Sequence, residues 1–98
     1  GDLNRIADSL LTKATMSRAV ADRLEALQSL AYMRDAAAIP CLRKLVLLQL
    51  WPGVAIEGIE RVGTADAATT LTELAGSKHP DTARLARASL ARLKSRGK

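Results

Sequence analysis

Apolar residues recur along the first part of the chain at the spacing of one helix face. From residue 3 they occupy positions i, i+3, i+4, i+7, i+8 and i+11, namely Leu3, Ile6, Ala7, Leu10, Leu11 and Ala14. An α-helix repeats about every 3.6 residues, so this spacing gathers these side chains on one side. We expect a helix over residues 3–14, with Asp2 as its N-cap.

Two more segments before the middle of the chain show the same periodicity. The apolar stripe of the second segment consists of Val20, Leu24, Leu27 and Ala31. It predicts a helix over 17–33 that Ser17 caps. The third helix is expected after Asp35, which can cap it, and extends to Leu50. Pro40 lies in its first turns, where a missing amide hydrogen costs little, so we expect a tight or irregular first turn.

Glycine and proline divide the second half of the chain into three shorter segments. After the turn Trp51-Pro52-Gly53 we expect helices over 54–62, 66–75 and 80–94, with ends marked by Gly63, Thr64, Gly76 and Pro80. Residues 95–98 are expected to fray. No segment alternates apolar and polar residues as a half-buried strand does. The pattern therefore predicts an all-α protein of about six helices.

The predicted helices repeat one another. Ala26, Leu30 and Met33 recur as Ala55, Ile59 and Val62, and again as Ala86, Leu90 and Leu93. Likewise, Ile39, Leu42 and Leu45 recur as Ala68, Leu71 and Leu74. A period of about 30 residues in a helical chain is typical of a solenoid, in which stacked neighbours bury what one helix pair cannot. We expect an alpha-alpha superhelix of about three helix pairs, with a right-handed tendency and incomplete first and last units.

Specific residues give these units a resemblance to the short HEAT-like repeats, the kind found in phycobilin lyases. In that family a Leu-Gly-x-Leu-Gly-Asp-like turn precedes Ala-Ile-Pro-x-Leu, and here residues 30–35 (Leu-Ala-Tyr-Met-Arg-Asp) precede Ala38-Ile39-Pro40-Cys41-Leu42. The second unit keeps Gly63, Ala67, Leu71 and Leu74 without the Ile-Pro pair, and Lys78-His79-Pro80-Asp81 with Arg84 resembles the start of a third. Arg23 matches an early family arginine. The resemblance covers about residues 20–93 and implies a helical scaffold more than any one function.

Composition is consistent with one domain over residues 1–98. Apolar residues make up 48% of the chain, and the only aromatic residues are Tyr32 and Trp51, so leucine, isoleucine, valine and alanine must build the core. Gly1 is an unusual first residue, from which we expect a tag remnant on a piece of a longer protein. The longest apolar run, Leu45–Leu48, is far too short for a membrane span, and we expect no membrane partner.

The residues that could carry chemistry are isolated from one another. His79 is the only histidine and lacks metal-ligand spacing, and the His-Glu pairs on which HEAT-like iron hydroxylases rely are absent. Cys41 cannot form an internal disulfide, fits a cytoplasmic location, and is expected to be a small buried side chain. Glu57, Glu60 and Glu73 are expected on helix surfaces in i, i+3 or i+4 pairs, such as Glu57 with Arg61. We therefore expect no enzyme, cofactor or metal.

The net charge of +5 comes entirely from residues 34–98, which hold eleven basic and six acidic residues. The charge is densest near the end of the chain, at Arg84, Arg87, Arg92, Lys94, Arg96 and Lys98. A solubilising terminus is one interpretation. Sequence-independent binding of the nucleic-acid backbone is the other, since some HEAT-like glycosylases hold DNA on a basic surface. No aromatic residues are interleaved to stack on bases.

Trp51 ends a stretch that is apolar almost all round the helix. Such a stretch is usually buried on several sides, although part of it, with Trp51, could instead face another domain or subunit. We therefore expect a protein–protein interaction scaffold whose partner is another protein or a neighbouring domain, with self-association as a further possibility. The candidate binding residues are Trp51, Arg84, Arg87, Arg92, Lys94 and Arg96.

Overall fold

The computed structural model describes residues 1–97, which form six α-helices and no strand. The helices are α1 (Asp2–Met16), α2 (Val20–Ala31), α3 (Ala38–Leu47), α4 (Pro52–Val62), α5 (Ala65–Ala75) and α6 (Pro80–Arg96). The predicted all-helical fold is confirmed. The end expected to fray is helical as far as Arg96, and Lys98 lies outside the described residues.

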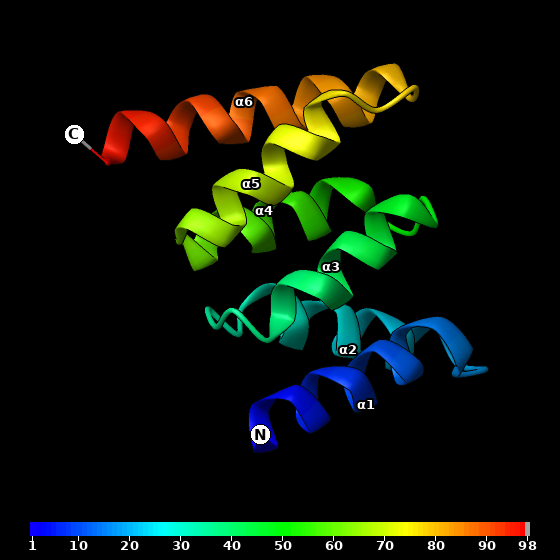
Figure 1. The fold of residues 1–98 in the computed structure, drawn as a ribbon. Helices are drawn as coiled ribbons and strands as arrows, with labels where there is room; N and C mark the ends of the chain where they lie inside the picture. The colour runs from blue at the N-terminus through cyan, green and yellow to red at the C-terminus, as the bar shows by residue number, and fades with distance from the viewer. Residues whose placement is uncertain (98) are drawn as a thin grey trace.

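The six helices lie in two layers (Figure 1). Each helix packs closely against its successor within the pairs α1–α2, α3–α4 and α5–α6. Between pairs, α2, α4 and α6 contact one another in order, as do α1, α3 and α5. The result is a flat molecule with extents of 39 × 30 × 17 Å.

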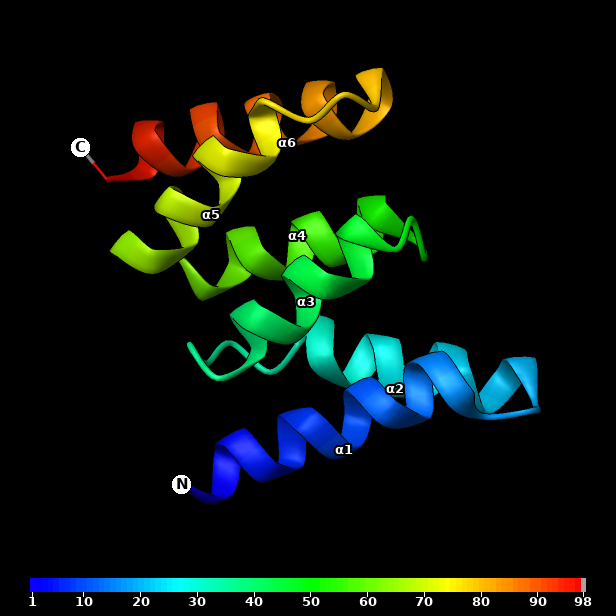
Figure 2. The ribbon, with the colours of Figure 1, turned by 45° about the vertical axis from the view of Figure 1, so that its right-hand side comes forward.

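The loops gather at two opposite edges of this flat molecule. The turns within pairs lie at one edge, on the right of Figure 1, and the links from α2 to α3 and from α4 to α5 lie at the other. Both termini lie near the edge of the links, and the turned view in Figure 2 gives the same division. Residues far apart in sequence but at equivalent places in the pairs therefore lie along a common edge.

Local hydrogen bonds explain where the helices begin. The Thr64 hydroxyl accepts a hydrogen bond from the Ala67 amide at 3.3 Å, which confirms Thr64 as the N-cap of α5. The caps predicted for α1 and α2 are wrong. Gly1 precedes α1, while Asp2 lies inside the first turn and pairs with Arg5. Ser17 lies ahead of α2, because its backbone carbonyl accepts a hydrogen bond from the Arg23 guanidinium and the helix begins only at Val20.

The entry into α3 has the tight turn expected from Pro40. The cap predicted at Asp35 is wrong, because the N-cap of α3 is Ala37. The Asp35 carboxylate instead accepts a hydrogen bond from the Ala37 amide at 2.9 Å, within the turn before the helix. The Ala38 amide donates to the Asp35 carbonyl at 2.9 Å, three residues back, as in a 3₁₀ turn. The helix ends at Leu47, three residues earlier than expected, because Gln49 and Trp51 have left-handed backbone conformations with φ of 57° and 47°.

The repeat seen in the sequence is also a repeat in burial. Ala26, Ala55 and Ala86 are each no more than 1% exposed. Leu30 and Ile59 are completely buried and Leu90 is partly buried, while Met33, Val62 and Leu93 are all partly buried. Equivalent positions thus have similar surroundings in the three even-numbered helices, with α6 the most open.

The predicted apolar face of α1 is only partly used. Ala7 and Ala14 are fully buried and Leu10 and Leu11 partly so, but Leu3 and Ile6 are about half exposed. The reason is the place of α1 at the end of the stack, where only α2 and α3 pack against it.

A glycine sets the separation between α2 and α4. A Cβ atom added at Gly58 would lie 2.8 Å from the Ala31 Cα and 3.0 Å from the Leu42 Cδ1. We expect Gly58→Ala to destabilise the protein, because overpacking costs about 1–3 kcal/mol and alanine regains at most about 1 kcal/mol of helix propensity. Urea denaturation measures the change.

The matched control is Gly53→Ala in the same helix, where the added Cβ would meet only the Leu85 Cδ1 at 3.8 Å. That variant is expected to unfold at an unchanged or slightly higher urea concentration. Equal stability of the two variants would show that α2 and α4 tolerate the methyl group and that their close approach is not limiting.

Candidate functional site

Exposed apolar side chains gather at the edge formed by the turns within pairs. They come from the α1–α2 turn and the α3–α4 turn, and we name the set the turn edge: Met16, Val20, Leu47, Leu48, Trp51 and Val54. The α5–α6 turn at the same edge is polar, with Ser77, Lys78 and His79. Apolar exposure along this edge therefore ends at the second pair.

Trp51 ends the second turn as the N-cap of α4 and is 36% exposed. The apolar stretch before it divides into two parts, because Leu45 and Val46 are completely buried while Leu47 and Leu48 are about half exposed. The early end of α3 accounts for Leu48, which lies beyond the helix, whereas Leu47 is still its last residue. The prediction that this stretch is buried is therefore wrong for its second half.

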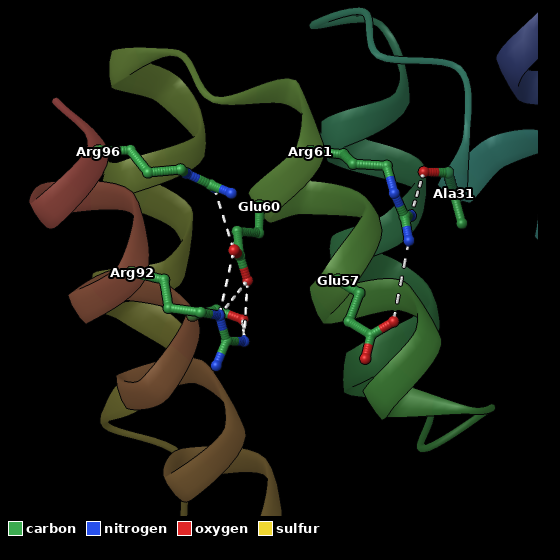
Figure 3. Close-up of polar contacts among 7 residues, drawn as sticks. Ala31, Glu57, Glu60, Arg61, Arg92 and Arg96 are labelled. Carbon is green, nitrogen blue, oxygen red and sulfur yellow. Dashed lines mark hydrogen bonds and ion pairs between the residues drawn. The ribbon is translucent and has the colours of Figure 1, made fainter.

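The cluster of basic residues on α6 is partly neutralised by a buried carboxylate. Figure 3 shows Glu60 of α4 between Arg92 and Arg96 of α6. Arg92 donates from Nε at 3.2 Å and from Nη2 at 2.9 Å to the Glu60 Oε1, and the Arg96 Nη2 lies 3.0 Å from Oε2. Glu60 is only 8% exposed, so its expected place on the helix surface is wrong.

The environment of Glu60 favours its charged form. Burial on its own would raise the pKa of this carboxyl group, but hydrogen bonds from Arg92 and Ser89 and the charges of Arg92 and Arg96 outweigh burial. The pKa therefore lies below its ordinary value. At neutral pH Glu60 is an anion that joins α4 to α6.

The other basic residues predicted for binding differ in whether they already contact a carboxylate or a backbone carbonyl. Arg84 lies 3.6 Å from the Asp81 carboxylate, and Arg87 donates a hydrogen bond to the Ala75 carbonyl at 3.3 Å. Lys94 makes no ion pair with any carboxylate in residues 1–97. Hence the five basic residues predicted for binding do not form one free positive row.

Of the ion pairs predicted for the other two carboxylates, the one for Glu57 is confirmed and the one for Glu73 is wrong. Glu57 and Arg61 form the predicted i, i+4 pair, at 3.9 Å. The intrahelical pair predicted for Glu73 is wrong, because Arg43 of α3 donates from Nε to its Oε1 at 3.0 Å. The interacting residues are 30 apart for Glu73 and 32 apart for Glu60, which is close to the repeat length. Local spacing could not find them, whereas alignment of the repeats could have.

Arg61 occupies the position in its repeat that Arg92 occupies in the next. Arg61 and Arg92 are 31 residues apart and each reaches back to the preceding even-numbered helix. Arg61 donates to the Ala31 carbonyl at 2.9 Å and its guanidinium lies 3.9 Å from the centre of the Tyr32 ring (Figure 3 shows the carbonyl contact). Both arginines thus join neighbouring pairs.

Cys41 and His79 occupy the places expected for them. Cys41 is buried, with its Sγ 3.7 Å from the Asp8 carboxylate, and burial together with Asp8 raises the pKa of the thiol to about 11. Such a thiol is a poor nucleophile at neutral pH. His79 is an exposed loop residue before Pro80. Within residues 1–97, no three histidine, cysteine or acidic side chains group as metal ligands would.

Comparison with protein-family models, curated proteins and solved structures found no match to this chain. Among the described helices, none has both the length and the apolar character needed to cross a membrane.

Proposed function

We propose that this chain is a protein-binding module, a solenoid of three HEAT-like helix pairs that contacts another protein or a neighbouring domain through the turn edge. The exposure of six apolar side chains in and beside two turns at that edge carries the proposal, because exposed apolar patches are typical of interaction sites. Trp51 and the leucines beside it would supply the buried contact area. A second copy of the chain is the alternative occupant, which sedimentation at high protein concentration distinguishes.

The pattern of contacts supports the solenoid part of the proposal. Even-numbered helices contact even-numbered ones and odd contact odd, with equivalent alanines buried in each unit. The ion pairs Arg43–Glu73 and Arg92–Glu60 each join residues that are about one repeat apart in the sequence. In a solenoid, each unit contacts only its neighbours and a surface extends along the stack, as protein-binding repeats require.

Backbone binding of nucleic acid is less well supported. Duplex binding depends on free cations that can each release a counterion from a phosphate. Arg92 and Arg96 share the Glu60 carboxylate, and Arg84 lies beside Asp81. Three of the five predicted basic residues are thus already near a negative charge.

Selection of displayed random peptides on the immobilised chain tests the proposal. We expect enriched peptides to be rich in apolar residues and to lose at least about tenfold in affinity for Leu48→Ser/Trp51→Ser. The expected loss follows because each apolar side chain removed from water contributes about 1.5–3 kcal/mol.

The matched control is Leu3→Ser/Ile6→Ser, which also removes two exposed apolar side chains, but from α1. Circular dichroism verifies that both variants fold. Peptides that bind both variants equally well would exclude the turn edge. Binding of a labelled duplex at about 50 mM salt, without any enriched peptide, would favour the nucleic-acid alternative instead.

A further inference from the structure

A basic cleft lies at the edge opposite the turn edge, where the links between pairs and the C-terminal part of α6 meet. Its volume is about 540 Å³, within the range of ligand-binding clefts. The cleft is lined by residues from the α2–α3 link, α4, the start of α5 and α6. It therefore combines the α2–α3 link with residues of the second and third helix pairs.

The repeat explains why the cleft is open and why it is basic. The last apolar residues of the sequence repeat are Met33, Val62 and Leu93, and the residues that follow them are Arg34, Gly63 and Lys94. All three line the cleft. Gly63 has no side chain, so the middle unit leaves space between the two cationic side chains contributed by the units on either side. The left-handed backbone of Gly63, with φ of 72°, favours glycine at this place.

Cations outnumber carboxylates in this cleft. Arg34, Arg61, Lys94 and Arg96 line it together with a single carboxylate, Glu60, which leaves three positive charges in excess. Neither Arg34 nor Lys94 forms an ion pair with a carboxylate in the part of the chain that the structure describes. Arg96 is held by Glu60, with its side chain 59% exposed, and Arg61 is held by the Ala31 carbonyl, so both guanidinium groups are fixed in direction.

Part of the remaining lining is apolar. Leu93 of α6 and Ala65 and Ala68 of α5 lie among the cations. A free phosphate, or the phosphate backbone of a nucleic acid, would leave this apolar surface uncovered. A peptide with carboxylate and apolar side chains would satisfy both parts of the lining.

We propose that the basic cleft binds an acidic peptide segment of a partner protein, with Arg34 and Lys94 as the free cations that receive its carboxylates and Leu93 as an apolar contact. This site is separate from the turn edge and does not depend on it. It uses Arg61 and Arg96 mainly as fixed positive charges at the sides of the cleft, since both already have partners within the protein.

A fluorescein-labelled peptide of Glu-Glu-Leu repeats is the probe, titrated by fluorescence anisotropy at low salt. The test variant is Arg34→Gln/Lys94→Gln, which leaves every ion pair described for residues 1–97 intact. The matched control is Arg18→Gln/Lys78→Gln, with the same change in charge in the turns at the opposite edge. We expect the test variant to weaken binding at least about tenfold and the control to change it less than about twofold.

Equal weakening in the two variants would overturn the proposal, because net charge alone would then explain binding. Equally tight binding of a peptide with glutamine in place of glutamate would also overturn it. Competition by a duplex oligonucleotide or by inorganic phosphate at lower concentration than the unlabelled peptide would assign the cleft to phosphate groups instead. Since the test variant leaves the turn edge unchanged, failure here leaves the proposed function standing.

Discussion

Leu30→Ala is expected to lower the free energy of unfolding by about 2–5 kcal/mol, a large share of the stability of a domain of this size. Leu30 is completely buried, and the equivalent Ile59 is completely buried in the next pair. Removal of its branched end would leave a cavity that the surrounding helices fill only in part. The urea midpoint, with its slope, gives the change.

The matched control for this variant is Leu48→Ala, the same chemical change at a leucine that is 51% exposed. It is expected to cost less than about 1 kcal/mol. If Leu30→Ala unfolds at the same urea concentration as Leu48→Ala, then Leu30 is not a core residue and the repeat register assigned to the helices is mistaken.

Glu60→Gln is expected to destabilise the protein by about 1–3 kcal/mol near neutral pH. The amide cannot accept two charge-assisted hydrogen bonds from Arg92 and one contact from Arg96 as the carboxylate does. Both arginines are more than half exposed, so water partly replaces the lost partner and the cost stays below that of a fully buried pair. Glu57→Gln on the same helix, with a 62% exposed side chain, is the control and is expected to cost less than about 0.5 kcal/mol.

The pH dependence of the Glu60 contribution follows from the direction of its pKa. The folded-state pKa lies below the ordinary value of 4.5, so the stabilisation is fully present above the unfolded pKa and is lost as pH falls through the folded pKa. The difference in stability between wild type and Glu60→Gln is therefore constant near pH 7 and shrinks below about pH 4.5. A difference that grows on acidification would contradict the ion-pair assignment.

Helix periodicity and turn chemistry were sufficient for much of the fold. The sequence predicted α4 and α5 to within two residues, because Gly63 and Thr64 mark the boundary between them by backbone conformation and by a side-chain hydrogen bond. Periodicity also identified the face of α1 but not its burial, since exposure of Leu3 and Ile6 depends on whether another helix covers that face.

The interaction surfaces were less predictable, for two physical reasons. The exposure of Leu48 and Trp51 follows from left-handed residues in the α3–α4 turn, which no glycine marks in the sequence. The engagement of Arg92 and Arg96 follows from a carboxylate about one repeat earlier, outside the range of i, i+4 rules. Contacts between residues about one repeat apart can be predicted only by comparing equivalent repeat positions, such as Arg61 with Arg92.

Acrylamide quenching of Trp51 fluorescence, with and without a saturating selected peptide, tests the proposed protein contact most directly. Trp51 is the only tryptophan and lies 36% exposed within the turn edge, so its quenching reports on that surface alone. We expect intermediate quenching in the free chain and a clear fall once the peptide is bound. Unchanged quenching at saturation would contradict the proposal that a partner protein covers the turn edge.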